Sequence, residues 1–213
     1  MPAPQAAPPP AAGRRARKRA ETRERIFRAA LRLFAERGFT ATTVEDITEA
    51  ADVGKGTFFN YFPSKEHVLA AFGEMQVGKV AAVMAEARSS AQPLRAVLLH
   101  MVQALAEEPG RSPALVRALL AANLTSAPVR ELMLHNLERA RDLLAEFFAV
   151  AQKRGALRRG LDPERVAVGM QRMFFGTMFM WAIDPCEALK KRFEHSFELF
   201  WSSIHARAHR GKE

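Results

Sequence analysis

The sequence predicts an all-α protein of about nine helices: a small N-terminal three-helix helix-turn-helix domain, followed by a larger helical bundle. Two observations support this fold class. Alanine, leucine, arginine and glutamate, all strong helix formers, are abundant, and alternating strand patterns are absent. In addition, proline or glycine separates the helical segments along most of the chain.

Length and composition limit the class of protein further. A chain of 213 residues that is 48% hydrophobic can bury a sizeable core. Its single cysteine excludes an intramolecular disulfide framework and a multi-cysteine zinc site. The longest strongly apolar stretch, Met173 to Ile183, is shorter than the roughly 20 residues of a membrane span. Because no secretory signal pattern is present either, we expect a cytoplasmic protein without a membrane partner.

The charge is strongly basic and unevenly distributed. The formal net charge is +9, and residues 14–65 carry 12 basic and 7 acidic side chains. Such an excess favours a polyanionic partner, most often nucleic acid, although charge that serves only solubility gives the same pattern.

Residues 1–19 are predicted to form a disordered tail and a basic arm. Residues 1–13 are rich in proline and alanine and have no apolar period. The basic run comprises Arg14, Arg15, Arg17, Lys18 and Arg19. It is either a solvated charge cluster or an arm that follows phosphates or enters a minor groove.

Residues 20–66 are predicted to form the helix-turn-helix domain. The first helix, about residues 20–37, buries a stripe at i, i+4, i+7 and i+8 from Ile26 and ends at Gly38. The second begins at Thr42 or Thr43 and ends near residue 51, and a third spans about 55–61. Pro63 ends it, and a long fourth helix covers about 65–88.

Residues 67–213 are predicted to form a larger helical bundle. Five further helices have a proline near their starts, where proline is tolerated best. Their expected ranges are about 93–107, 113–125, 128–154, 163–182 and 186–208.

Two short helices joined by a tight turn within residues 42–61 form a helix-turn-helix, whose second helix has a free face. A DNA major groove is wide enough to admit one such helix. The surrounding residues carry a more specific signal. Phe34, Gly38, Phe39, Thr42 and Thr43 precede a segment, 52–66, that reads DVGKGTFFNYFPSKE.

This pattern resembles the DNA-binding domain of the TetR/AcrR family of transcriptional regulators. Three positions depart from it. Asp52 replaces the usual turn glycine, and aspartate tolerates the left-handed region better than most residues. Gly54 replaces a serine cap. Phe59 replaces a frequent tyrosine, so a hydroxyl contact to phosphate is lost.

The resemblance and the geometry together assign DNA-binding roles. Thr43 offers its hydroxyl and backbone N–H to a phosphate, and Lys55 can donate to a guanine edge. Asn60 suits an adenine edge or a phosphate. Tyr61 and Lys65 match phosphate contacts, with a half-buried core ring and a solvated cap residue as the respective alternatives. The expected set is Thr42, Thr43, Lys55, Gly56, Thr57, Phe59, Asn60, Tyr61 and Lys65.

The remainder of the chain contains no catalytic or cofactor-binding motif, so we expect neither an enzyme nor a bound cofactor or metal. His205 and His209 have metal-ligand spacing but lie near a terminus. A helical enzyme with a basic face and a nonspecific architectural DNA-binding protein remain alternative functions.

The last two helices are unusually apolar. The resemblance implies that they form a four-helix dimer interface with a second copy, whereas a thick monomer core is the alternative. The expected interface residues are Phe175, Phe179, Phe193, Phe197, Phe200, Trp201 and Ile204.

The resemblance also implies that residues 67–213 form a ligand-binding and dimerisation domain with a ligand pocket in the bundle. Flexible methionine and flat phenylalanine side chains suit such a pocket. Candidate residues are Met101, Leu105, Leu119, Asn123, Phe147, Met170 and Phe174. The family then implies a ligand-responsive repressor that binds a pseudo-palindromic double-stranded DNA operator as a homodimer. A small apolar or aromatic effector is favoured.

Overall fold

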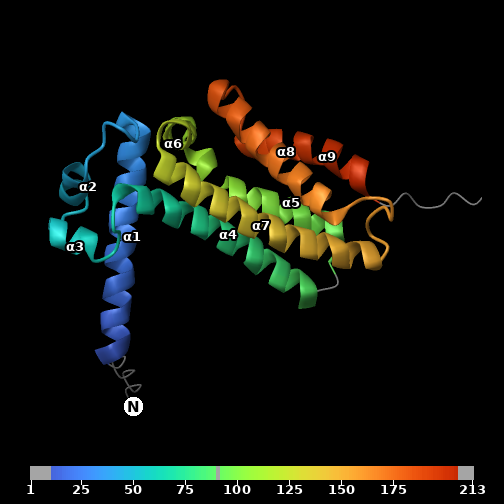
Figure 1. Cartoon of the computed structure of the whole chain (residues 1–213), viewed down its shortest axis with the longest axis horizontal. Helices are drawn as coiled ribbons and strands as arrows, with labels where there is room; N and C mark the ends of the chain where they lie inside the picture. Colours follow the sequence, from blue (N-terminus) through green and yellow to red (C-terminus); the bar gives the residue numbers. More distant parts are fainter. Residues whose placement is uncertain (1–10, 90–91, 206–213) are drawn as a thin grey trace, which may run out of the picture.

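The computed structural model describes residues 11–89 and 92–205 and confirms the all-α class (Figure 1). Within these residues the helices are α1 (Ala11–Arg37), α2 (Val44–Ala50), α3 (Lys55–Phe59), α4 (Lys65–Ser89), α5 (Leu94–Ala106), α6 (Pro113–Thr125), α7 (Ala127–Lys153), α8 (Pro163–Ile183) and α9 (Leu189–Ile204). A 3-10 helix covers Pro109–Arg111.

The N-terminal unit forms around the predicted stripe of α1. Ile26, Ala30 and Phe34 are fully buried there. Phe58 of α3 and Phe62 after it complete this core. The small helices α2 and α3 are thereby held against one side of α1, as Figure 1 shows.

Helix α1 begins earlier than predicted, because the sequence indicated a disordered tail over residues 1–13, then a basic arm, and a first helix from about residue 20. Residues 11–19, which include the basic run, are helical, and residues 1–10 lie outside the described range. Alanine and arginine have high helix propensity, and Arg17 pairs with Glu21 one turn later. The helix therefore includes the basic run instead of starting at about Ala20.

The last helix is shorter than the predicted range of 186–208. It begins at Leu189 and ends at Ile204, and His205 turns into an extended conformation that forms an isolated bridge with Leu157. Residues 206–208 lie outside the described range.

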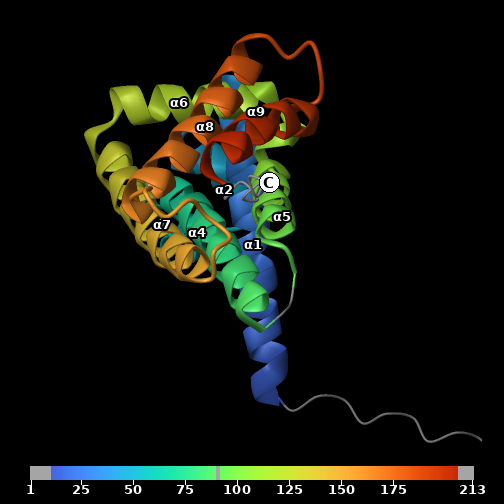
Figure 2. The same ribbon diagram turned by 90° about the vertical axis from the view of Figure 1, so that its right-hand side faces the viewer.

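In the bundle, α4 contacts both α5 and α7, α8 lies on α7, and α9 lies on α8 and α5 (Figure 2). Helix α6 contacts α1 on one side and α8 on the other. The core around α1–α3 also includes Phe72 of α4 and Leu115 of α6. The two units are thus joined through α4 and α6, although the boundary at residues 66 and 67 stays a prediction.

Helices α4 and α8 have the length and mean hydropathy of a membrane span. The longest continuous apolar stretch does not indicate this, because the apolar residues of each helix are spread over its whole length. The buried share of the most apolar window is 44% for α4 and 39% for α8. Helix α4 contacts α5 and α7, and α8 contacts α6, α7 and α9. Helices that other helices cover on several sides bury apolar residues against them, so the core helices of a bundle have the same apolar character.

Candidate nucleic-acid interface and ligand cavity

The turn between α2 and α3 has the geometry expected of a helix-turn-helix. Asp52 has a φ of 50°, which is the left-handed conformation predicted for this position. The Val53 N–H donates to the Thr48 carbonyl across the turn, and Ala51 is buried between the helices. Gly54 precedes α3 without a side-chain cap, as expected from its lack of a side chain.

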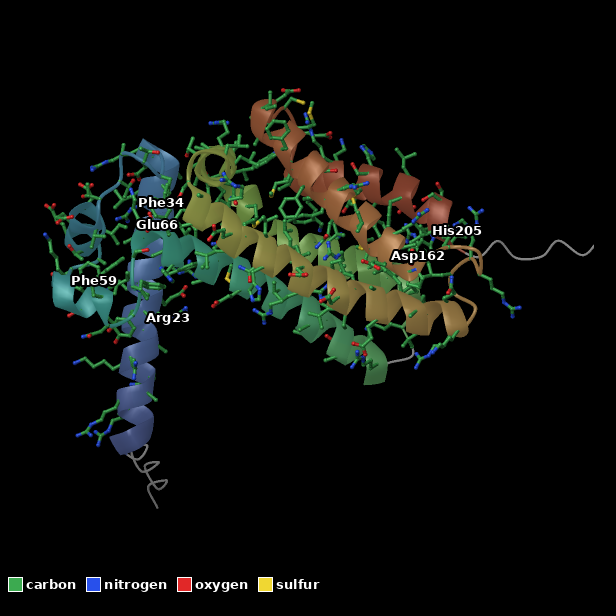
Figure 3. The ribbon with its side chains drawn as sticks, in the orientation of Figure 1. Arg23, Phe34, Phe59, Glu66, Asp162 and His205 are labelled. Atoms are coloured by element: carbon green, nitrogen blue, oxygen red, sulfur yellow. The ribbon has the colours of Figure 1, made fainter. Side chains whose placement is uncertain are left out.

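Helix α3 turns one face inward and leaves another open. Phe58 is fully buried, whereas Lys55, Gly56 and Asn60 are exposed and Phe59 is 52% exposed. Figure 3 shows Phe59 at the outer side of α3, away from α1 and α4. Apart from its chain neighbours and the backbone of its own helix, no heavy atom of the described residues lies within 4 Å of the position that a Cβ on Gly56 would occupy. The protein itself therefore leaves room for a larger residue at Gly56.

The charges beside this face are paired within the protein. The Lys55 ammonium forms an ion pair with Glu45 of α2. This hydrogen bond from Lys55 is the main cause that lowers the pKa of Glu45. A phosphate or base that binds Lys55 must compete with this carboxylate.

The two threonines before α2 are engaged inside the protein. Thr42 is fully buried and donates its hydroxyl to the Gly38 carbonyl at 2.8 Å, so the expected contact between its side chain and DNA is wrong. The Thr43 hydroxyl and backbone N–H both donate to Asp46, at 2.6 and 2.8 Å. These bonds lower the pKa of Asp46 and leave neither Thr43 donor free for a phosphate in this conformation.

Lys65 also has a different role from the one expected. Its ammonium donates to the carbonyls of Phe39, Thr40 and Thr42, at 2.9, 3.4 and 2.8 Å. It also lies 4.6 Å from the centre of the Phe39 ring. Because an ammonium has three donors, Lys65 is satisfied by the loop before α2, and neither the phosphate contact nor the solvated cap describes it.

We expect Lys65→Ala to destabilise the protein by about 1.5–3 kcal/mol, because loop carbonyls lose a charged donor. Urea unfolding followed by circular dichroism measures this loss. The matched variant Lys55→Ala, which removes only an exposed ion pair, is expected to unfold at the wild-type urea concentration. Equal midpoints for Lys65→Ala and wild type would contradict the structural role of Lys65.

Tyr61 is half-buried, in line with the alternative of a partly covered ring. The Arg19 guanidinium lies 5.9 Å from its ring centre. Thr57 is also partly buried.

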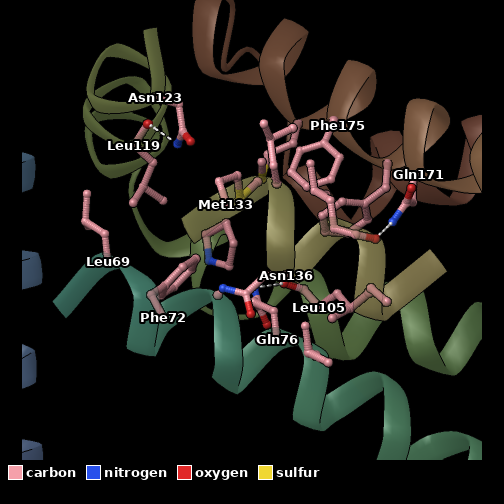
Figure 4. Close-up of a pocket in the computed structure, with 18 of the residues that line it drawn as sticks. Leu69, Phe72, Gln76, Leu105, Leu119, Asn123, Met133, Asn136, Gln171 and Phe175 are labelled. Atoms are coloured by element: carbon pink, nitrogen blue, oxygen red, sulfur yellow. Dashed lines mark hydrogen bonds between the residues drawn. The ribbon is translucent and has the colours of Figure 1, made fainter. Parts of the chain in front are cut away.

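A cavity of about 370 Å³ lies in the bundle between α4, α5, α6, α7 and α8 (Figure 4). The structure brings together at this cavity six of the seven residues predicted from the sequence: Met101, Leu105, Leu119, Asn123, Met170 and Phe174. Phe147 is absent from the lining and packs beside Phe148 at the edge of the bundle core. The prediction that Phe147 lines the ligand pocket is therefore wrong.

Helices α4 and α7 supply lining residues that were not predicted from the sequence, among them Phe72, Gln76, Met133 and Asn136. The amides Gln76 and Asn136 stand at otherwise apolar positions of their helices, which is the signal that could have identified them. The Gln76 amide nitrogen donates to the Leu105 carbonyl at 3.0 Å. The side-chain oxygens of Gln76 and Asn136 are buried without a partner in the described structure.

The predicted interface residues divide into two groups. Phe193 and Phe197 are fully buried and Ile204 is 4% exposed, so these three belong to the monomer core, and their assignment to a dimer interface is wrong. Phe193 stacks on Phe174 with ring centres 4.7 Å apart, which accounts for its burial. Phe175 lines the cavity, and Phe200 and Trp201 are partly buried.

An exposed apolar surface nevertheless covers α8 and α9. Phe179 is 45% exposed and Leu199 is 75% exposed, and Met180 and Ile183 are exposed as well. We call these four residues the α8–α9 surface.

Within the described ranges, no group of three or more potential metal-ligating side chains is found. His205 stacks on Trp201 with ring centres 5.5 Å apart, and His209 lies outside the described residues.

Comparisons with known proteins agree with this architecture. Residues 26–72 match the family model of bacterial regulatory proteins of the tetR family. TcmR of Streptomyces glaucescens, an HTH-type transcriptional regulator, is 50% identical over 56 residues, or 26% of this chain and 25% of TcmR. YerO of Bacillus subtilis is an uncharacterised HTH-type transcriptional regulator. It is 41% identical over 58 residues, which cover 27% of this chain and 20% of YerO.

The likeness to one solved structure extends over both parts of the chain. Thermus thermophilus FadR, a TetR-family transcriptional repressor solved in complex with lauroyl-CoA, is 33% identical. The match covers 90% of this chain and 99% of FadR, with a TM-score of 0.64. The helix-turn-helix, the bundle with its cavity and this full-length likeness together show that the chain belongs to the TetR family of bacterial transcriptional regulators.

Proposed function

We propose that the protein is a sequence-specific DNA-binding transcriptional repressor that acts as a homodimer and responds to a small apolar ligand. The open face of α3 is the observation that carries this proposal. Lys55 and Asn60 stand there beside Gly56, whose missing side chain leaves the helix backbone accessible. Lysine and asparagine are side chains that read guanine and adenine edges in a major groove.

Thr42 and Lys65 are excluded because their side chains are engaged inside the protein. The proposed DNA-binding residues are therefore Lys55, Gly56, Thr57, Phe59, Asn60 and Tyr61. Thr43 can contact a phosphate only when its hydroxyl and backbone N–H are no longer bonded to Asp46. Phe59 supplies apolar contact, for example to a thymine methyl group. Two copies of α3, about 34–36 Å apart in a dimer, would read the two halves of a pseudo-palindrome.

The cavity is the proposed effector site. A volume of about 370 Å³ falls within the range of small-molecule pockets, and most of the lining side chains are apolar. Since a relative 33% identical to this chain was solved with lauroyl-CoA, we propose an acyl chain as the first effector to test.

The walls of the cavity offer a route for the response. Leu69 and Phe72 of α4 line the cavity and also belong to the core around α1–α3. A ligand that favours a different position of α4 would change the placement of α3. The size of this effect is limited by the difference in ligand affinity between the two conformations.

Dimerisation through the α8–α9 surface leads to a second prediction. We expect the double variant Phe179→Lys/Leu199→Lys to remain folded but to be monomeric, because both side chains are exposed and two-fold symmetry brings four new charges together. Analytical ultracentrifugation measures the mass. Val150→Lys on α7 serves as the control, since it adds a charge at another exposed apolar position. A dimeric double variant would place the interface elsewhere.

We place the protein in the cytoplasm, together with its DNA target, and assign it no catalytic step. The function is tested by mobility-shift assays on DNA flanking the protein's own gene, with and without lauroyl-CoA. We expect one shifted fragment whose binding is weakened by the ligand. Equal affinity for unrelated sequences would instead support a nonspecific architectural protein.

A further inference from the structure

The N-terminal part of α1 extends beyond the body of the DNA-reading unit. Figure 1 shows it projecting past α2 and α3. From Gly13 to Arg25 no side chain is buried, and the first buried residue of the helix is Ile26. We call residues 13–25 the α1 extension. At 1.5 Å per residue it is roughly 20 Å long, and it contributes nothing to either core.

The α1 extension is strongly basic, and most of its basic side chains form no ion pair in the described structure. It contains seven basic and two acidic residues and no large apolar side chain. Arg17 pairs with Glu21, and Glu24 pairs with Arg28. In the part of the chain that the structure describes, no ion pair involves Arg14, Arg15 or Lys18.

The positive charge is concentrated on one side. In a helix of 3.6 residues per turn, half of the circumference carries Arg14, Arg15, Lys18, Arg19 and Arg23. The other half carries Arg17 and both acidic residues, Glu21 and Glu24.

The basic side of the α1 extension is the side that contacts the residues directly after α3. The Arg19 guanidinium lies 5.9 Å from the Tyr61 ring centre, and the Arg23 guanidinium lies 5.1 Å from that of Phe62. The Arg25 guanidinium also donates to the Asp52 carbonyl at 3.5 Å. These contacts hold the extension in a fixed direction relative to α3. Arg15 lies one turn before Arg19 on the same side and therefore continues this face outward.

We propose that Arg14, Arg15 and Lys18 bind backbone phosphates of the duplex next to the base pairs that α3 reads. This inference rests on the proposed DNA-binding function and adds a second, sequence-independent contact to it. Contacts to phosphates position a protein on DNA and release counterions, but they carry no sequence information directly. An anionic membrane fits less well, because membrane-surface helices need an apolar face that this segment lacks.

The test compares the salt dependence of DNA binding for wild type and Arg14→Ala/Arg15→Ala/Lys18→Ala. Alanine keeps the helix propensity of the segment. The probes are a duplex that wild type selects from a random pool, with long flanks, and a duplex of random sequence. The control variant Lys153→Ala/Arg154→Ala/Arg159→Ala removes the same charge from exposed positions at the far end of the bundle.

We expect the slope of log K against log salt to become less negative by about 0.9 for each lost phosphate contact, up to roughly 5 for a dimer. Affinity should fall by the same factor for both duplexes, and trimming the flanks should abolish the difference from wild type. The control should keep the wild-type slope.

An unchanged slope in the extension variant, with specific binding intact, would overturn this inference alone. If wild type shows no preference for any sequence, the proposed function, on which this inference rests, fails. Loss of binding to phosphatidylserine vesicles without a change in DNA binding would assign the extension to a membrane and also overturn the inference.

Discussion

Replacing Gly56 by alanine is expected to weaken specific DNA binding by about 5- to 150-fold while leaving the protein at least as stable as wild type. A Cβ at this position meets no described atom within 4 Å beyond its chain neighbours and its own helix backbone. Alanine is also favoured over glycine inside a helix by about 0.5–1 kcal/mol. The added methyl group would, however, enter the space between α3 and the bases. Misfit in a close-packed contact costs about 1–3 kcal/mol, which corresponds to the stated range.

Gly78→Ala is the matched control for this variant. Gly78 is exposed on α4, and a Cβ there also meets no atom within 4 Å. Both variants should unfold at equal or higher urea concentration than wild type, but only Gly56→Ala should lose affinity for the selected duplex. Wild-type affinity in Gly56→Ala would show that the backbone of α3 does not approach DNA closely.

The largest loss of stability is expected for Phe193→Ala, at about 3–5 kcal/mol. This ring is fully buried in the bundle and stacks on Phe174, so its removal leaves a cavity next to the proposed effector site. Thermal unfolding should show a decrease in Tm of roughly 6–20 °C.

Leu134→Ala provides the comparison, because Leu134 is 59% exposed and its truncation leaves no buried void. We expect it to unfold close to the wild-type temperature. If Phe193→Ala instead kept its Tm and became monomeric, the residue would belong to the dimer interface, as the sequence had indicated.

The sequence predicted the helices well because local signals determine most of their ends. Proline stands at the starts of α6, α7 and α8, and Gly38 has the positive φ expected after α1. The start of α1 was missed because a polar, proline-flanked segment was assigned to the tail. The chain after residue 10 is in fact rich in helix formers.

The site was predictable in position but not in every role. A motif identifies Thr42 and Lys65 as part of the DNA-binding unit. Their true partners, Gly38 and the loop carbonyls of residues 39–42, depend on the folded path of the chain. Hydrophobic periodicity likewise could not separate Phe193 from Phe179, because α8 and α9 are apolar on more than one side.

The central claim is that α3 lies in a major groove. It is tested most directly by measuring whether the bound protein protects guanine N7 atoms of the selected duplex from methylation. Guanine N7 is exposed only in the major groove. We predict two protected clusters about one helical turn apart, both weakened by Gly56→Ala. Full methylation of every guanine under saturating protein would contradict the account.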